Sequence, residues 1–143
     1  MAFTSDQNQA LTTYDYSQLF NGNFKVITGT YTNSSGSEVE LEPGMLFGRV
    51  HATSLLAILA SGSSDGSQIP LGVNLTTATV ANGASQTVTL AVTGRVNEDK
   101  LVFDGTDTLL TVVDSRQLRD RIPADTAGIE LESFTELVNY ENS

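Results

Sequence analysis

The stretch LEPGMLFGRVHATSLLAILASGSSDGSQIPLGVN (residues 41–74), taken together with GRVNEDKLVF (residues 94–103), decides the fold of this chain. Pro43-Gly44 fits the central positions of a type II turn, because proline presets φ and glycine tolerates a positive φ. A short apolar strand over residues 45–50 follows the turn, and residues 61–67 have the composition of an exposed loop. Short apolar runs separated by such turns predict a β-rich domain.

On both sides of this stretch, the sequence shows the two-residue alternation that is typical of β-strands. Residues 24–32, 71–75 and 128–132 read as strands. Residues 38–42 predict a half-exposed strand with one face of carboxylates, namely Glu38, Glu40 and Glu42. In residues 86–93, the side chains expected to point inward are Val88, Leu90 and Val92, and those expected to point outward are Thr87, Thr89 and Ala91. The pair Asn82-Gly83 predicts a hairpin turn.

The last third of the chain predicts one short helix. Asp114-Ser115-Arg116-Gln117 resembles a capping box, with Asp114 as the N-cap. The helix is expected to end at Arg121 or Ile122, because Pro123 would stop it. Leu118 and Ile122 lie four residues apart and would form its buried side.

Composition limits the functions that this chain can have. It has 143 residues, of which 39 % are hydrophobic, so we expect one domain with a real core. Its 7 Lys and Arg against 17 Asp and Glu give a net charge of −10, which argues against nucleic-acid and anionic membrane partners. The chain has no cysteine, which excludes disulfides and thiol chemistry. We see no signal peptide at its start.

The sequence offers little for catalysis or cofactor binding, and we predict no enzyme, cofactor or metal site. His51 is the single histidine, and no nucleophile motif lies near it. The carboxylates Asp99, Asp104 and Asp107 lack the spacing of a calcium loop. A catalytic carboxylate pair distant in sequence stays open, although no motif supports one.

Two regions are candidates for contacts with other proteins. We predict that residues 1–23 form an extended arm and that residues 24–143 form a single β-rich domain. The arm carries the apolar side chains Tyr14, Tyr16, Leu19 and Phe20, which either bind a partner or pack back on their own domain. The densest basic cluster is Arg116, Arg119 and Arg121; it is either a solvated face paired with Asp114 and Asp120 or a contact patch for an acidic neighbour, such as a second copy.

Three segments, in this order and spacing, resemble a known family. They are Pro43–Gly48, the loop and strand Asp65–Val73, which follows the pattern D-G-x-Q-x-P-x-G-V, and Leu118–Ile122 with the later pair Gly128-Ile129. Together they resemble the lambda-type head decoration proteins of tailed bacteriophages. The resemblance covers most of the chain from about Phe24 onward.

The resemblance implies a fold and a role. The fold would be a small compact β-barrel or β-tulip-like domain, mainly β with one or two short helices (α+β), with an extended N-terminal arm. The protein would bind as homotrimers at threefold positions of the expanded phage head and stabilise it, after synthesis in the host cytoplasm. It would lie on the outer capsid surface, with its arm on the major capsid protein and with Tyr14, Tyr16, Leu19 and Phe20 as anchors. Deleting residues 1–22 would then abolish capsid binding and leave the domain folded.

One feature departs from the family, and two other functions remain open. This chain is longer than the shortest members, with an extended acidic C-terminus from Glu130. The first alternative is a carbohydrate- or receptor-binding β module of a phage tail or surface fibre, against which stands the absence of tryptophan for stacking on sugars. The second is an enzyme of unknown type.

Overall fold

Five strands close into a barrel in a computed structural model that describes residues 18–133 of the chain. Their order around the barrel is β2, β5, β4, β6 and β8, with neighbours antiparallel except for β2 and β5, which run parallel. The bounds are β2 (Val26–Thr32), β4 (Leu46–Arg49), β5 (Leu56–Ile58), β6 (Gly72–Asn74) and β8 (Ser85–Ala91). The prediction of a mainly β domain with a barrel is confirmed.

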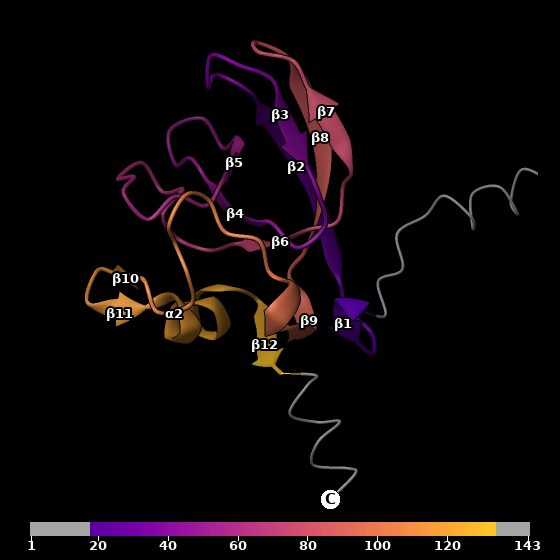
Figure 1. Ribbon diagram of the computed structural model, residues 1–143, viewed down its shortest axis with the longest axis vertical. Coiled ribbons are helices and arrows are strands. Elements are labelled where there is room, and N and C mark those ends of the chain that lie inside the picture. Colours follow the sequence, from indigo (N-terminus) through magenta and orange to yellow (C-terminus); the bar gives the residue numbers. More distant parts are fainter. Residues whose placement is uncertain (1–17, 134–143) are drawn as a thin grey trace, which may run out of the picture.

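A second layer lies beneath the barrel (Figure 1). It contains a three-stranded sheet in the order β1 (Phe20–Asn21), β9 (Thr93–Asn97) and β12 (Gly128–Glu132). Strand β1 is antiparallel to β9, whereas β12 is parallel to it. The helix α2 (Leu118–Asp125) packs against β12, and the small hairpin of β10 (Val112–Val113) and β11 (Arg116–Gln117) lies beside α2. A 3-10 turn, η2 (Glu98–Lys100), follows β9.

The two quoted segments meet in space. The Val102 amide donates to the Gly44 carbonyl at 2.8 Å, and Met45 and Val102 form a parallel bridge. Gly44 has φ +100° and the Met45 amide donates to the Glu42 carbonyl at 3.4 Å, which confirms the type II turn. The chain after η2 therefore fastens the lower layer to the barrel.

Two apolar clusters make up the core. The first fills the barrel and contains Tyr31, Leu41, Phe47, Leu56, Val80, Val88 and Leu90. The second lies between the barrel and the lower layer and includes Leu19, Phe20, Val73, Ala91, Val96, Leu118, Ile122 and Ile129. Ala91 was expected to point outward, and this prediction is wrong: it is fully buried, because the end of β8 lies between the two clusters.

The predicted turn at Asn82-Gly83 forms, but the strands on its two sides do not pair with each other as a hairpin would require. The Ala84 amide donates to the Ala81 carbonyl at 3.0 Å, and Gly83 has φ +85°. This turn joins β7 (Ala78–Val80) to β8, but β7 pairs with β3 (Val39–Leu41) rather than with β8. The turn therefore carries the chain from one sheet to another.

The predicted capping box is also wrong. Asp114 and Ser115 have φ +49° and +75° and form the two-residue turn between β10 and β11, a conformation typical of type I′ hairpins. Helix α2 begins at Leu118 after Gln117, which makes no side-chain cap, and it continues past Pro123 to Asp125. Leu118 and Ile122 are its buried residues, as predicted.

The loop over residues 61–67 is exposed only in part. Its last residues, Gly66 and Ser67, are buried, and Ser67 is 3 % exposed. Ser67 lies under Gly48, where an added Cβ would come within 2.7 Å of the Ser67 carbonyl oxygen. The glycine at 48 therefore allows this loop to pack on the barrel.

Candidate functional site

The two ends of the described chain leave the molecule at the same place. The Asn97 amide donates to the Leu19 carbonyl at 2.7 Å, and the Asn97 side-chain amide donates to the Gln18 carbonyl at 3.0 Å. On the other side of β9, Glu132 is in register with Asn97, and the next residue, Ser133, donates to Asp99 at 3.4 Å. Residues 1–17 and 134–143 are therefore both attached at the Asn97 end of the three-stranded sheet.

Asn97 fixes this exit point. Its side chain is buried, and its Oδ1 accepts from the Asp99 amide at 3.1 Å, which caps η2. A buried amide with all of these partners specifies one local geometry, since losing any partner leaves a polar group unsatisfied. The positions of Gln18 and Leu19 are therefore set by the domain.

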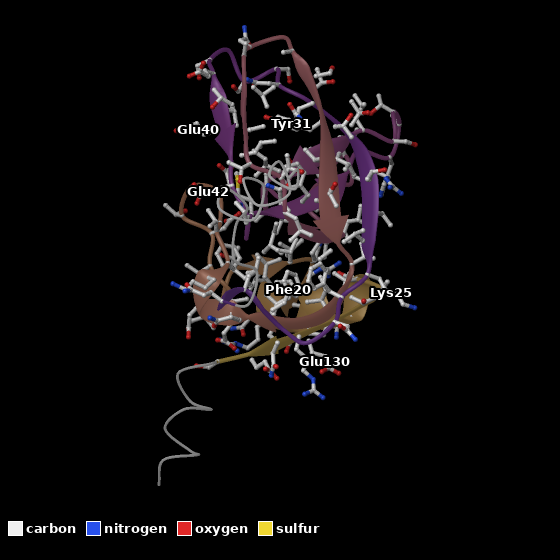
Figure 2. The ribbon with its side chains drawn as sticks, turned by 90° about the vertical axis from the view of Figure 1, so that its right-hand side faces the viewer. Phe20, Lys25, Tyr31, Glu40, Glu42 and Glu130 are labelled. Atoms are coloured by element: carbon white, nitrogen blue, oxygen red, sulfur yellow. The ribbon has the colours of Figure 1, made fainter. Side chains whose placement is uncertain are left out.

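The outward face of the same sheet is polar. Asn21, Arg95 and Glu130 lie in one row across the three strands, and the Asn21 side chain donates to Glu132 Oε1 at 3.0 Å. Arg95 Nε lies 3.4 Å from Glu130 Oε1, with 60 % and 70 % of the two side chains exposed, so the pair adds little stability. Figure 2 shows Glu130 pointing away from the barrel, whereas Phe20 lies inside.

A shallow hollow of ≈ 470 Å³ adjoins this face. It is lined by Asn21, Gly22, Asn23, Gly94, Arg95, Gly128 and Glu130. Three of these residues are glycines with positive φ, and at Gly94 an added Cβ would lie 2.8 Å from the Cβ of Phe24, so glycine is needed there for the strand to pack on its own domain. Its lining of amide and charged groups suits polar contacts with another protein surface. We name the face and the hollow together the polar pole.

The four predicted arm anchors divide into two pairs. Tyr14 and Tyr16 lie outside the described residues. Leu19 and Phe20 are 0 % and 3 % exposed, and the Phe20 ring stacks on Phe24 with 4.3 Å between centroids. Sequence analysis left open whether the anchors bind a partner or pack on their own domain, and Leu19 and Phe20 pack on their own domain. A capsid-binding role for the four residues stays a prediction.

The three arginines lie on two different elements. Arg116 is on β11 and exposed, whereas Arg119 and Arg121 are on α2. Arg119 makes a two-pronged ion pair with Glu98, at 3.2 and 3.0 Å. Arg121 pairs with Asp125 at 3.1 Å and donates to the Val113 carbonyl at 3.1 Å. The partners differ from the expected Asp114 and Asp120, because the hairpin moves Asp114 away from the helix.

The other candidate chemical groups serve local structure. His51 is exposed, and its amide donates to the Asp65 carbonyl at 2.8 Å. Hydrogen bonds from Ser67 lower the pKa of Asp65, whose Oδ1 accepts from the Ser67 hydroxyl at 2.6 Å. Asp107 accepts from the Ser61 hydroxyl at 2.7 Å and joins two loops. The carboxylates of Glu40 and Glu42 lie on the outside of the barrel (Figure 2).

Two features are absent from the part of the chain that the structure describes. Residues 18–133 contain no group of three or more His, Cys, Asp or Glu that could hold a metal ion. In the same residues, no helix is long and apolar enough to cross a membrane.

Sequence reasoning missed the polar pole. The two-residue alternation places Glu130 in a strand over residues 128–132, but no pattern in the sequence pairs it with Arg95 or places Asn97 beside it. The signal that was available is the pattern Asn97-Glu98-Asp99, in which an asparagine before two acidic residues is typical of a helix N-terminus.

Comparison with known proteins gives one family. The model described as Bacteriophage lambda head decoration protein D matches residues 9–117, which is most of the chain. The match includes two of the three resembling segments and ends just before Leu118. A search of curated proteins gave no match.

Proposed function

The chain belongs to the bacteriophage lambda head decoration protein D family, and on this premise we propose that it binds as trimers at threefold positions of an expanded phage head and stabilises it. The direct partner is the major capsid protein, contacted by the N-terminal arm. The protein is made in the host cytoplasm and ends on the outer surface of the virion.

The observation that carries this proposal is the common exit of both chain ends at the polar pole. Asn97 holds Gln18 and Leu19 at the edge of the sheet, so an arm that begins there starts from a fixed place. A fixed start lowers the entropy that the arm loses when it binds. The arm and the polar pole can therefore contact one surface together.

The buried pair Leu19 and Phe20 changes the bounds of the proposed arm. Because both are core residues, we assign the capsid contact to residues 1–17, with Tyr14 and Tyr16 as its aromatic anchors, and give Leu19 and Phe20 the role of fastening the arm to the domain. An extended segment can add main-chain hydrogen bonds to a strand of the capsid protein, while its aromatic side chains fill pockets. Many copies on a lattice then stabilise it by multivalent binding.

Co-sedimentation with expanded, protein-only shells of the same phage tests this function. We expect saturable pelleting at about one trimer per threefold site, as the threefold geometry requires. A chain lacking residues 1–17 should stay folded and fail to pellet. Deletion of residues 1–22 would not leave the domain intact, because it would remove Leu19, Phe20 and β1 from the core.

Two results would contradict the proposal. The first is unchanged pelleting of the chain without residues 1–17, which would exclude the arm as the contact. The second is failure of the folded full-length chain to pellet, which would favour the tail or fibre module. Coated and bare shells should also differ in the temperature and osmotic shock at which they rupture.

A further inference from the structure

The hairpin of β10 and β11 carries the most exposed apolar side chains of residues 18–133. Leu110 is 62 % exposed and Val112 is 60 % exposed, while their neighbours Leu109 and Val113 are buried. The alternation places Leu110 and Val112 on the outward face, together with Gln117, which pairs with Val112 across the hairpin. We name these three residues the hairpin face. Leu110 and Val112 are the two most exposed large apolar side chains of residues 18–133, and they lie two residues apart on one face.

The hairpin is held rigidly by the domain. The amides of Leu118 and Arg119 donate to the carbonyls of Thr111 and Leu109, both at 2.8 Å. The Arg121 guanidinium donates to the Val113 carbonyl at 3.1 Å. An element fixed in this way loses little entropy on binding, so its exposed side chains can contribute most of their burial energy to a contact.

The same chain carries a hollow that complements the hairpin face. It measures ≈ 270 Å³ and is lined by Arg49, His51, Gly66, Ile69, Pro70, Leu71 and Asp125. Ile69, Pro70 and Leu71 give it an apolar floor, and Arg49 gives its rim a positive charge. We name it the barrel hollow.

The charges near the hairpin face and the barrel hollow also complement each other. Among residues 18–133, Arg49 makes no ion pair, and neither does Asp114 at the tip of the hairpin. Asp125, the one carboxylate of the hollow, is already paired with Arg121 at 3.1 Å. An approaching Asp114 would therefore meet an Arg49 cation that no carboxylate of residues 18–133 pairs with.

We propose that the hairpin face of one copy docks in the barrel hollow of a neighbouring copy, with Leu110 and Val112 on Ile69 and Leu71 and with Asp114 facing Arg49. This inference rests on the proposed function, which brings copies side by side, and names the contact between them. The two surfaces differ, so the contact is heterologous, and repeating it through a closing rotation produces a ring.

The direction of the hairpin favours a second copy over the capsid protein. It projects sideways beside α2, away from the strands β1, β9 and β12 that form the polar pole (Figure 1). A lateral neighbour is therefore closer to it than a surface that holds the polar pole. Arg119 and Arg121 are paired inside their own subunit, whereas Arg116, on the hairpin itself, makes no ion pair among residues 18–133.

Disulfide trapping between copies tests the proposal directly, because the chain has no cysteine of its own. Val112→Cys and Ile69→Cys chains are mixed on expanded shells and oxidised. We expect a mixed disulfide dimer, since bonding requires the two Cα atoms within about 7 Å. The matched control is Val26→Cys, which is 48 % exposed on the barrel and should give no dimer with Ile69→Cys.

Charge reversal gives a second test. Asp114→Arg and Arg49→Asp should each weaken binding of full-length protein to shells about tenfold, as loss of about 1.4 kcal/mol per contact requires. The double variant should regain most of the affinity. Glu40→Arg, on the outside of the barrel, serves as the control and should bind as the original chain does.

The possible results of these two tests distinguish failure of the proposed contact from failure of the proposed function. Pelleting without the mixed disulfide, or a Val112→Cys disulfide with itself, would overturn the contact and leave capsid binding intact. Attachment of a photoreactive label at Val112→Cys to the shell protein would overturn it in favour of the capsid. If nothing pellets, the proposed function fails, and the same oxidation at high protein concentration without shells decides the contact.

Discussion

Replacing Phe20 with alanine distinguishes a role of this residue in the domain core from a role in contacting the capsid. Phe20 is 3 % exposed, belongs to the core between the two layers and stacks on Phe24 at 4.3 Å. Removing such a buried ring costs about 3–5 kcal/mol, through lost burial and the cavity left behind. Domains of this size are stable by about 5–15 kcal/mol, so the variant should lose at least about a fifth of its stability.

Urea unfolding followed by circular dichroism measures this loss. The midpoint should fall with an unchanged slope, and the melting temperature should drop by roughly 10 °C, at about 3 °C for each kcal/mol. The matched control is Tyr16→Ala, in the segment proposed to contact the capsid. It should melt as the original chain does but pellet poorly with shells.

One pattern of results would refute this reasoning. A Phe20→Ala chain that unfolds at the original urea concentration but no longer pellets would mean that Phe20 contributes to the capsid contact rather than to the core. Loss of stability with normal pelleting of the remaining folded protein, in contrast, would leave Phe20 as a residue that only fastens the arm.

Three further changes test the fold around the site. Gly48→Ala should destabilise the domain by roughly 2 kcal/mol in urea, since its Cβ would lie 2.7 Å from the Ser67 carbonyl oxygen, while Gly62→Ala, with open space, should change stability by less than about 1 kcal/mol. Ser115→Gly should stabilise the domain by roughly 1 kcal/mol, because it relieves a side chain at φ +75°; a lower melting temperature would contradict this. The pKa of Asp65 lies below its ordinary 3.8, so this carboxylate stabilises the fold above that pH and the effect is lost on acidification through the lowered pKa. Ser67→Ala should raise that pKa in an NMR titration, and an unmoved value would show that Ser67 does not cause the shift.

The strands were predictable because burial leaves a two-residue pattern in the sequence. The alternation of residues 86–93 identified Val88 and Leu90, which are fully buried in β8. The pattern failed at Ala91, because a strand between two cores is buried on both faces. A single sequence does not show which strands have a second layer behind them.

Turns and helix caps were harder to predict than strands, because the same residue types favour both. Asp114-Ser115 has the composition of a helix N-terminus and also of a two-residue hairpin turn. The hairpin forms here because Val113 is buried in the core beside α2, and this position holds β10 against β11. Tertiary packing therefore favours the hairpin turn over the helix cap at these two residues.

The polar pole could not be predicted, since it depends on pairings between distant residues. Asn97 joins Gln18, 79 residues earlier, and faces Glu132 in the parallel pair of β12 and β9. No local pattern identifies such partners. The sequence therefore predicts an arm but not the place at which residues 18 and 19 are held.

The part of the chain beyond the family match completes this pole. The match ends at residue 117, yet Leu118, Ile122 and Ile129 are fully buried in the same core as Leu19. Strand β12 also supplies Glu130, opposite Arg95, and Glu132, which accepts from Asn21. A chain ending at residue 117 would lack the side chains of α2 and β12 that share a core with Leu19 and Phe20. It would also lack β12, the strand that pairs with β9 at Asn97. The arm's fixed starting point is thus a property of residues at both ends of the chain, and capsid binding should depend on the C-terminal strand even if that strand never touches the capsid.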